Sequence, residues 1–188
     1  MNSPRRPVDL VRPWPKLASK HGAPLILFRP RYDTVRNPRT DEVFERLVLE
    51  TSDWVNVVAL TPERRLVVVH QYRFGSASVT TEIPGGVIDP GELHELAARR
   101  ELREETGYTS EKWRYLGCVE PNPAFHTNLC HHWLAEDVAC THPQEMDRGE
   151  DIAIEALALD DVRARIHSGA IRHSLVITAL ARVLDLRP

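Results

Sequence analysis

Between residues 24 and 79, hydrophobic side chains fall in short runs separated by polar turns. The runs are rich in valine, leucine, isoleucine and aromatic residues, which is typical of β-strands. Residues 43–50 roughly alternate apolar and polar positions, as a half-exposed antiparallel strand does. Residues 65–72 contain a continuous apolar run, as a strand buried on both faces does. This part of the chain is therefore predicted to form a series of strands.

A loop and a helix are predicted next. Residues 82–92 read EIPGGVIDPGE, and their three glycines and two prolines indicate a tight loop without regular structure. The following residues, up to Gly107, lack proline and are rich in strong helix formers. Glycine is a common residue just past the end of a helix, so Gly107 is predicted to end this one. Few apolar residues lie along this helix, so it should pack on one narrow face.

The rest of the chain continues the mixed pattern. Three strands are predicted at residues 113–120, 129–138 and 152–159, followed by helices at 160–169 and 170–186. Strands, a helix, more strands and two closing helices indicate an α+β fold. We predict a single domain over residues 24–188, with N-terminal strands at 24–50. Residues 1–23 contain four prolines and are predicted to be a poorly ordered leader.

Composition narrows the class of protein. Charged residues make up 27% of the 188 residues and the net charge is −3, so nothing favours a nucleic-acid partner. No apolar run reaches 18 residues, so no membrane span is expected. The three cysteines form no CxxC pair, which argues against a disulfide framework or a thiolate zinc site. A reducing, cytoplasmic location fits these thiols.

Three carboxylates on the first predicted helix carry the chemistry. Glu101, Glu104 and Glu105 are spaced at i, i+3 and i+4, which places them on one helix face. They repel one another unless something neutralises them, and a hard cation such as Mg²⁺ or Mn²⁺ prefers oxygen ligands. The alternative is a solvated helix face of salt bridges, because arginines are interleaved at positions 99, 100 and 103.

A longer pattern favours the metal site. Its fixed positions are Gly86, Glu92, Arg100, Glu101, Leu102, Glu104, Glu105, Gly107 and Tyr108. This pattern resembles the Nudix box throughout, except that Tyr108 stands where the family usually has an aliphatic residue. The resemblance implies an α/β/α sandwich with a central mixed β-sheet, preceded here by N-terminal antiparallel strands. It also implies attack by a metal-activated water on a pyrophosphate phosphorus.

The same resemblance assigns roles to residues of the box. Glu101 and Glu105 would be the main ligands of Mg²⁺, with Mn²⁺ as a possible substitute, and the Gly85 carbonyl would complete the inner shell. Glu104 would ligate the metal or orient the attacking water. Arg100 would hold a carboxylate of the box in place through a charge-assisted pair. Glu92 is expected to be structural.

Flanking residues resemble the ADP-ribose pyrophosphatase branch of the family. They are the segments Gln71–Arg73, Glu82–Gly86 and Glu150–Ile152, together with Pro123. In that branch Glu150 would complete the metal site. Arg73 would contact a substrate phosphate, unless it is only a surface arginine at a strand end. Glu82 would touch either a ribose or only an arginine, and Pro123 is grouped with the substrate-binding residues.

Two departures from the branch leave its details open. Arg148 stands where the branch often has an acidic residue proposed as the base, so the base is Glu150, Asp147 or no residue beyond the metals. Residues 125–128 also lack the usual glycine and serine, so specificity for ADP-ribose is expected to be relaxed. A histidine metal site is not expected, because His131 and His132 are neighbours on a strand and point to opposite faces.

The leading hypothesis is metal-dependent hydrolysis of the pyrophosphate bond in ADP-ribose or a related nucleoside diphosphate sugar. The products would be a nucleoside monophosphate and a sugar phosphate. One alternative keeps the chemistry and changes the substrate to a dinucleotide, coenzyme A or a nucleoside triphosphate. A second alternative is a nucleotide-sensing module without turnover. The branch also implies a homodimer that forms through the strands at 24–50, with Trp54 near that contact and able to stack on a base.

Overall fold

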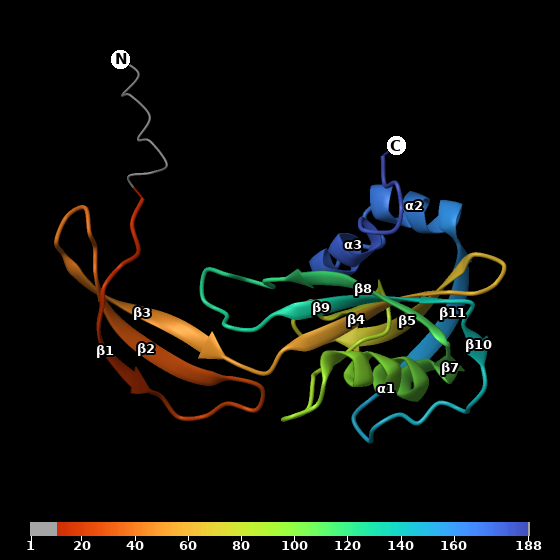
Figure 1. Cartoon of the computed structure of the whole chain (residues 1–188), viewed down its shortest axis with the longest axis horizontal. Coiled ribbons are helices and arrows are strands. Elements are labelled where there is room, and N and C mark those ends of the chain that lie inside the picture. The colour runs from red at the N-terminus through yellow and green to blue at the C-terminus, as the bar shows by residue number, and fades with distance from the viewer. Residues whose placement is uncertain (1–10, 188) are drawn as a thin grey trace, which may run out of the picture. The chain divides into compact units, whose positions relative to one another are not determined.

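The structure is a computed structural model that describes residues 11–187. Its described residues divide into two compact units (Figure 1). The first unit runs up to Thr51 and also contains residues Asn122–Thr127. The second unit contains residues Ser52–Pro121 and the chain from Asn128 onward.

The first unit is a three-stranded antiparallel sheet of β1 (Lys16–His21), β2 (Arg29–Arg36) and β3 (Val43–Glu50). Asp33 on β2 is 6% exposed, and the Arg31 guanidinium and the Ser19 hydroxyl hold its pKa at about 2. The segment from residue 122 to 127 joins the sheet through backbone hydrogen bonds between Leu49 and residues 125 and 127. Polar contacts rather than an apolar core therefore dominate this unit.

Strand β1 lies inside the stretch that the sequence assigns to a poorly ordered leader, and residues 1–10 of that leader lie outside the described residues. All six residues of β1 are exposed. The strand is held by backbone pairing with β2 and by the ion pair between Lys16 and Asp33, 3.3 Å apart. Because neither contact requires a hydrophobic pattern, the sequence carried no signal for this strand.

The second unit is built on a six-stranded mixed sheet. Its main path runs β11 (Ile152–Ala158), β5 (Arg65–Arg73), β4 (Trp54–Leu60), β9 (Cys130–Glu136) and β8 (Lys112–Val119), and β6 (Ser78–Glu82) pairs with β5. Strands β4 and β9 are parallel, and the other pairs of this sheet are antiparallel. A short ribbon of β7 (Tyr108–Thr109) and β10 (Ala139–Cys140) lies outside this sheet.

Helices cover both faces of the sheet (Figure 1). Helix α1 (His94–Thr106) packs Ala97, Ala98 and Leu102 against one face. Helices α2 (Leu159–His167) and α3 (Ser174–Leu180) close the apolar core on the other face. Successive side chains along the buried central strands point to opposite faces of the sheet. Each strand therefore contributes residues to the apolar cores on both faces. The unit is therefore the predicted α/β/α sandwich with a central mixed sheet.

The last helix is shorter than the sequence predicts. Its hydrophobic spacing predicts a helix over residues 170–186, whereas α3 covers Ser174–Leu180. Gly169 ends the preceding turn with φ 78°, and the buried Ile171 donates its backbone N–H to the Arg165 carbonyl. After Leu180 the chain tightens into turns, with bonds such as Val183 N–H to the Leu180 carbonyl. The apolar residues beyond the helix are thus buried by turns.

Between residues 11 and 187, the helices are all too short or too polar to cross a membrane.

Candidate active site

Helix α1 presents the carboxylates of the box. It ends at Gly107, which adopts the left-handed conformation at φ 72° and donates its N–H to the Arg103 carbonyl at 2.7 Å. Near this end, Glu101 and Glu105 lie one turn apart, and Glu105 is only 4% exposed. The C-cap that the sequence predicts therefore fixes the end of the helix directly beside the acidic cluster.

The glycine loop passes close to these carboxylates. Val57 donates its N–H to the Pro84 carbonyl at 2.8 Å, and Val55 donates to the Gly86 carbonyl at 2.9 Å. Gly85 lies between these two residues and donates its N–H to Oε2 of Glu105 at 3.0 Å. The hydrogen bond from Gly85 therefore places the backbone of the glycine loop directly against the Glu105 carboxylate.

Both glycines are required by space. A Cβ added to Gly86 would lie 2.4 Å from Oε1 of Glu101, and one added to Gly85 would lie 2.1 Å from the Val55 carbonyl oxygen. Any larger residue would move either the Glu101 carboxylate or strand β4. The two glycines thus allow the backbone of the loop to approach the carboxylates of Glu101 and Glu105 closely.

The electrostatics of this cluster favour a cation. Burial raises the pKa of Glu105 to about 8, although its hydrogen bond from Gly85 opposes the rise. Burial also raises the pKa of Glu101 to about 7, against the opposing effect of Arg100. The carboxylates of Glu101 and Glu105 offer oxygen ligands only, which suits a hard divalent cation. The residues present therefore fit a divalent cation.

Arg100 ties several carboxylates of the helix together. Its Nε and one amino group bind the two oxygens of Glu92 at 3.0 and 2.9 Å. Its other amino group donates to Glu101 at 2.8 Å and to Glu104 at 3.2 Å. Glu104 also accepts from Arg103 at 3.1 Å. Arg100 thus holds Glu101 in place while Glu104 faces the arginines.

Glu150 lies on the loop that precedes β11. Its carboxylate accepts the Asp147 backbone N–H at 3.0 Å. Its charge contributes to the raised pKa of both Glu101 and Glu105, so it lies within their electrostatic reach. Across residues 11–187, however, no group of three or more His, Cys, Asp or Glu side chains is arranged to hold a metal ion. The structure brings together Glu101, Glu105 and the Gly85 backbone, while Glu104 and Glu150 have other partners.

Arg73 and Glu82 form a fixed pair beside the cluster. The Nε and an amino group of Arg73 each donate to one oxygen of Glu82 at 2.8 Å, and Thr80 donates to the same carboxylate at 2.6 Å. Glu82 is 2% exposed. The pKa of Arg73 is raised first by Glu82 and further by the charges of Glu105 and Glu150. The arginine is therefore held rigidly within the field of the acidic residues.

The two other residues assigned to substrate binding are Trp54 and Pro123. Trp54 begins β4, donates its N–H to the Leu129 carbonyl at 2.8 Å and forms a backbone bridge with Val87. Pro123 belongs to the segment of the first unit between residues 122 and 127.

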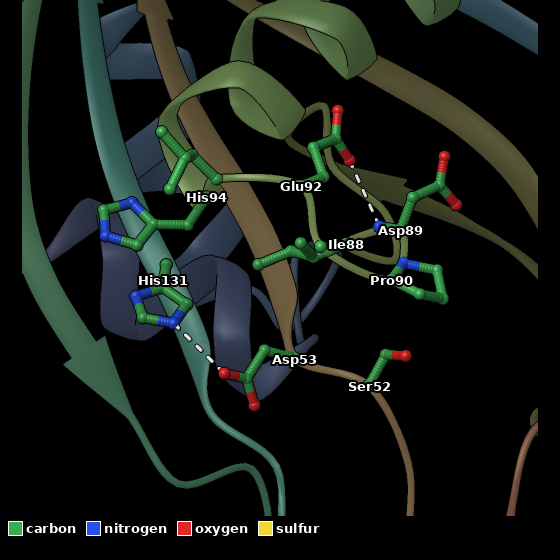
Figure 2. A pocket seen from close by; sticks show the side chains of 10 residues that line it. Ser52, Asp53, Ile88, Asp89, Pro90, Glu92, His94 and His131 are labelled. Carbon is green, nitrogen blue, oxygen red and sulfur yellow. Dashed lines mark hydrogen bonds and ion pairs between the residues drawn. The ribbon is translucent and has the colours of Figure 1, made fainter.

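A pocket of about 300 Å³ lies at the other end of α1 (Figure 2). Its wall includes Asp53, His94 and His131, with Glu92 on its rim. The rings of His94 and His131 stack 4.4 Å apart, and His131 contacts Asp53 at 3.4 Å. This group has no signal in the sequence, because its members come from separate elements and share no spacing. His132 lies buried on the opposite side of β9 from His131, as predicted.

Comparisons with known proteins agree with this geometry. The chain matches the model of the NUDIX domain family over residues 52–179. It is 31% identical to an ADP-ribose pyrophosphatase of Bacillus subtilis (strain 168), over 66% of this chain and 68% of that protein. It is 32% identical to a methanol dehydrogenase activator of Bacillus methanolicus, over 67% of this chain and 69% of the relative. A crystal structure of an ADP compounds hydrolase superposes with a TM-score of 0.81, covering 92% of this chain and 93% of that one. At 20% identity, that likeness shows the fold alone.

A matching family model over most of the chain, a shared fold and an acidic helix against a glycine loop define one class of protein. The chain belongs to the NUDIX domain family. Within that family it is a Nudix pyrophosphohydrolase similar to the ADP-ribose pyrophosphatases.

Proposed function

We propose that this enzyme hydrolyses the pyrophosphate bond of ADP-ribose or a closely related nucleoside diphosphate sugar. The observation that carries the proposal is the approach of Glu101 and Glu105 to the glycine loop at Gly85 and Gly86. The Bacillus subtilis relative named ADP-ribose pyrophosphatase supports the choice of substrate.

The reaction needs a divalent cation, which we propose to be Mg²⁺, with Mn²⁺ as a substitute. When bound, the ion neutralises phosphate charge and acidifies the attacking water. Glu101, Glu105 and the Gly85 carbonyl would hold it. Arg100 orients Glu101, and Glu104, which contacts Arg100 and Arg103, would bind the ion or orient the water.

The remaining residues of the site move a proton and bind phosphate. Glu150, or Asp147 beside it, takes a proton from the water as its oxygen bonds to phosphorus. The bond from phosphorus to the bridging oxygen breaks, giving AMP and a sugar phosphate. Because Glu82 occupies two donors of Arg73, the guanidinium is held in one orientation, and its remaining amino group is available to a phosphate oxygen.

Two further substrate contacts are part of the proposal. We assign Trp54 to stacking on the nucleobase, since aromatic rings bind bases through their faces. We assign Pro123 to the wall of the substrate site on the strength of the sequence resemblance alone.

A substrate panel tests the proposed function. AMP release from ADP-ribose with Mg²⁺ should exceed hydrolysis of GDP-mannose, UDP-glucose, NADH and ATP, and EDTA should abolish it. Faster turnover of NADH or ATP would retain the hydrolase and move the substrate to another nucleotide class. If no diphosphate is cut with either Mg²⁺ or Mn²⁺, the hydrolytic function is rejected.

We further propose that the enzyme is a homodimer that forms through the first unit. Leu17, Val43 and Leu47 expose apolar side chains on its sheet, with 49%, 51% and 44% of their surfaces exposed. Burial of such side chains against a second copy would supply the apolar core that this unit lacks.

The three free thiols at positions 118, 130 and 140 support a reducing, cytoplasmic location as part of the same proposal.

A further inference from the structure

In the loop before β11, one side chain is less exposed to solvent than all the others. Across residues 141–150, all of which the structure describes, every residue except Gln144 is exposed. The loop also carries Asp147 and Glu150, which are the two candidates for the base. Gln144 is therefore the position through which this loop can be fixed.

The Gln144 amide joins two elements. Its Nε2 donates to the backbone carbonyl of Glu105 at 2.7 Å and to that of Ile152 at 3.2 Å. The Glu105 carbonyl lies in the last turn of α1, where carbonyls lack a partner within the helix. The two hydrogens of one amide nitrogen match the two carbonyls. The amide thus links the helix residue that bears the carboxylate to the first residue of β11.

Neighbouring contacts fasten the first part of the loop to the same helix end. Glu145 donates its backbone N–H to the Glu104 carbonyl at 2.9 Å, and its carboxylate contacts Arg103 at 2.7 Å. The Gly107 carbonyl accepts the N–H groups of Thr141 and His142. Gln144 also binds Ile152 at the far end of the loop. Both ends of the loop at residues 145–151 are therefore held by hydrogen bonds.

We propose that Gln144 is a positioning residue for the hydrolytic reaction. It fixes the loop at residues 145–151 relative to Glu105, so that Glu150 or Asp147 stays within reach of the metal ligands. The inference rests on the proposed function of that loop. Gln144 touches no reacting atom in this scheme and acts only through the loop. Small displacements of catalytic groups cost large factors in rate, so losing this link should be visible in turnover.

The main test replaces the amide without changing the volume of the side chain. Gln144→Met removes both donors, and Met146→Gln is the matched control because Met146 is 43% exposed on the same loop. We expect Gln144→Met to lower kcat by about tenfold to a hundredfold with KM little changed. The control should behave as the parent enzyme does. An unchanged kcat, or a rise in KM alone, would overturn the proposal.

A double-mutant cycle asks whether Gln144 acts through the loop carboxylates. In a Glu150→Gln background, Gln144→Met should have little further effect on kcat. The same cycle with Asp147→Asn covers the second candidate base. If Gln144→Met lowers kcat by the same factor in both backgrounds, its effect does not pass through either residue and the positioning role is wrong.

Two readouts do not depend on turnover, so they separate this inference from the proposed function. Trypsin should cleave after the exposed Arg148 faster in Gln144→Met than in Met146→Gln, because the loop is released. The affinity for Mn²⁺, measured by electron paramagnetic resonance, should fall about tenfold. If the parent cleaves no diphosphate, the proposed function fails by itself. Unchanged proteolysis and unchanged Mn²⁺ affinity would reject the anchoring role of Gln144 whatever the substrate.

Discussion

At the scale of single residues, the burial of Glu105 is the feature with the largest chemical consequence. Its carboxylate is almost enclosed and has one backbone donor, Gly85. In Glu105→Gln, the Gly85 N–H can still donate to the side-chain amide oxygen. The negative charge that binds a cation is lost. We expect kcat to fall by at least about a hundredfold in assays with saturating Mg²⁺.

A matched control for this substitution lies on the same helix. Glu95→Gln removes only an ion pair with Arg99, in which both side chains are more than a third exposed. It should leave turnover near the parent value, and thermal unfolding in EDTA should show that both variants are folded. Equal losses of activity in the two variants would contradict the assignment of Glu105 as a metal ligand.

A second residue, His132, makes stability depend on pH. It is fully buried on β9, and neither ring nitrogen meets a hydrogen-bond partner among residues 11–187. Burial lowers its pKa to about 4, with smaller contributions from Arg182 and His131. The folded state therefore binds this proton less readily than the unfolded state does. The contribution of His132 to stability is therefore present in full above about pH 6.5 and is lost as the pH drops toward 4, by about 3 kcal/mol at most. The raised pKa values of Glu101 and Glu105 act in the opposite direction over the same range.

The test compares unfolding free energies from urea titrations between pH 4.5 and 7. His132→Leu removes only the contribution of this ring, because a leucine binds no proton in either state. The unfolding free energy of the parent should therefore fall relative to that of His132→Leu as the pH drops from 7 to 4.5. His167→Gln, at an exposed histidine, should keep the slope of the parent. Parallel curves for the parent and His132→Leu would show that this residue is not the cause.

At the scale of elements, the end of α1 depends on one glycine. Gly107 has φ 72°, and a Cβ there would lie 2.1 Å from the His142 carbonyl oxygen. Gly91 has a similar φ of 84° but open space around it. Gly91→Ala therefore measures the backbone cost alone, about 1 kcal/mol, whereas Gly107→Ala adds a clash with the chain after β10.

Unfolding by urea should consequently show a larger loss of stability for Gly107→Ala than for Gly91→Ala. Activity should follow the same order, because the clash pushes His142 and the loop beyond it away from the helix. Equal losses in the two variants would mean that the backbone relaxes around the added methyl group and that the close approach is not restrictive.

The same helix shows what sequence could and could not predict about the elements. Its residue types, the glycine loop and Gly107 are local signals, and the structure confirms that a helix ends there. The family pattern also identified Glu101 and Glu105 as a pair before any fold was known. The contacts of Gln144 and the stack between His94 and His131 had no such signal. They depend on contacts between segments that are distant along the chain.

At the scale of the whole molecule, the first unit should decide the oligomeric state. The proposed dimer buries apolar side chains on β1 and β3, so Leu17→Glu combined with Leu47→Glu should favour the monomer. Each leucine contributes roughly 1.5–3 kcal/mol when buried, which predicts a loss of at least about a hundredfold in dimer affinity. Light scattering after size-exclusion chromatography measures the outcome.

Leu96→Glu serves as the control, because Leu96 is exposed to 54% on α1 of the second unit. It should leave the mass in solution unchanged. A parent protein that is monomeric at every concentration would reject the dimer itself. The hydrophobic pattern predicted strands in this unit, but it could not predict their partner. A half-exposed strand has the same hydrophobic pattern whether its outer face meets solvent or another chain.

The parallel pairing of β4 with β9 also bears on how the chain reaches its native state. Trp54 aligns with Cys130, and the glycine loop, α1 and β8 all lie between these two strands in the sequence. The central pair of strands can therefore form only when a segment distant in the sequence is available. Contacts between segments that are far apart in the sequence slow folding. During synthesis, the apolar β4 and β5 emerge from the ribosome well before β9 is available to cover them. The nascent enzyme is thus most exposed to aggregation while helix α1 and strand β8 are being made.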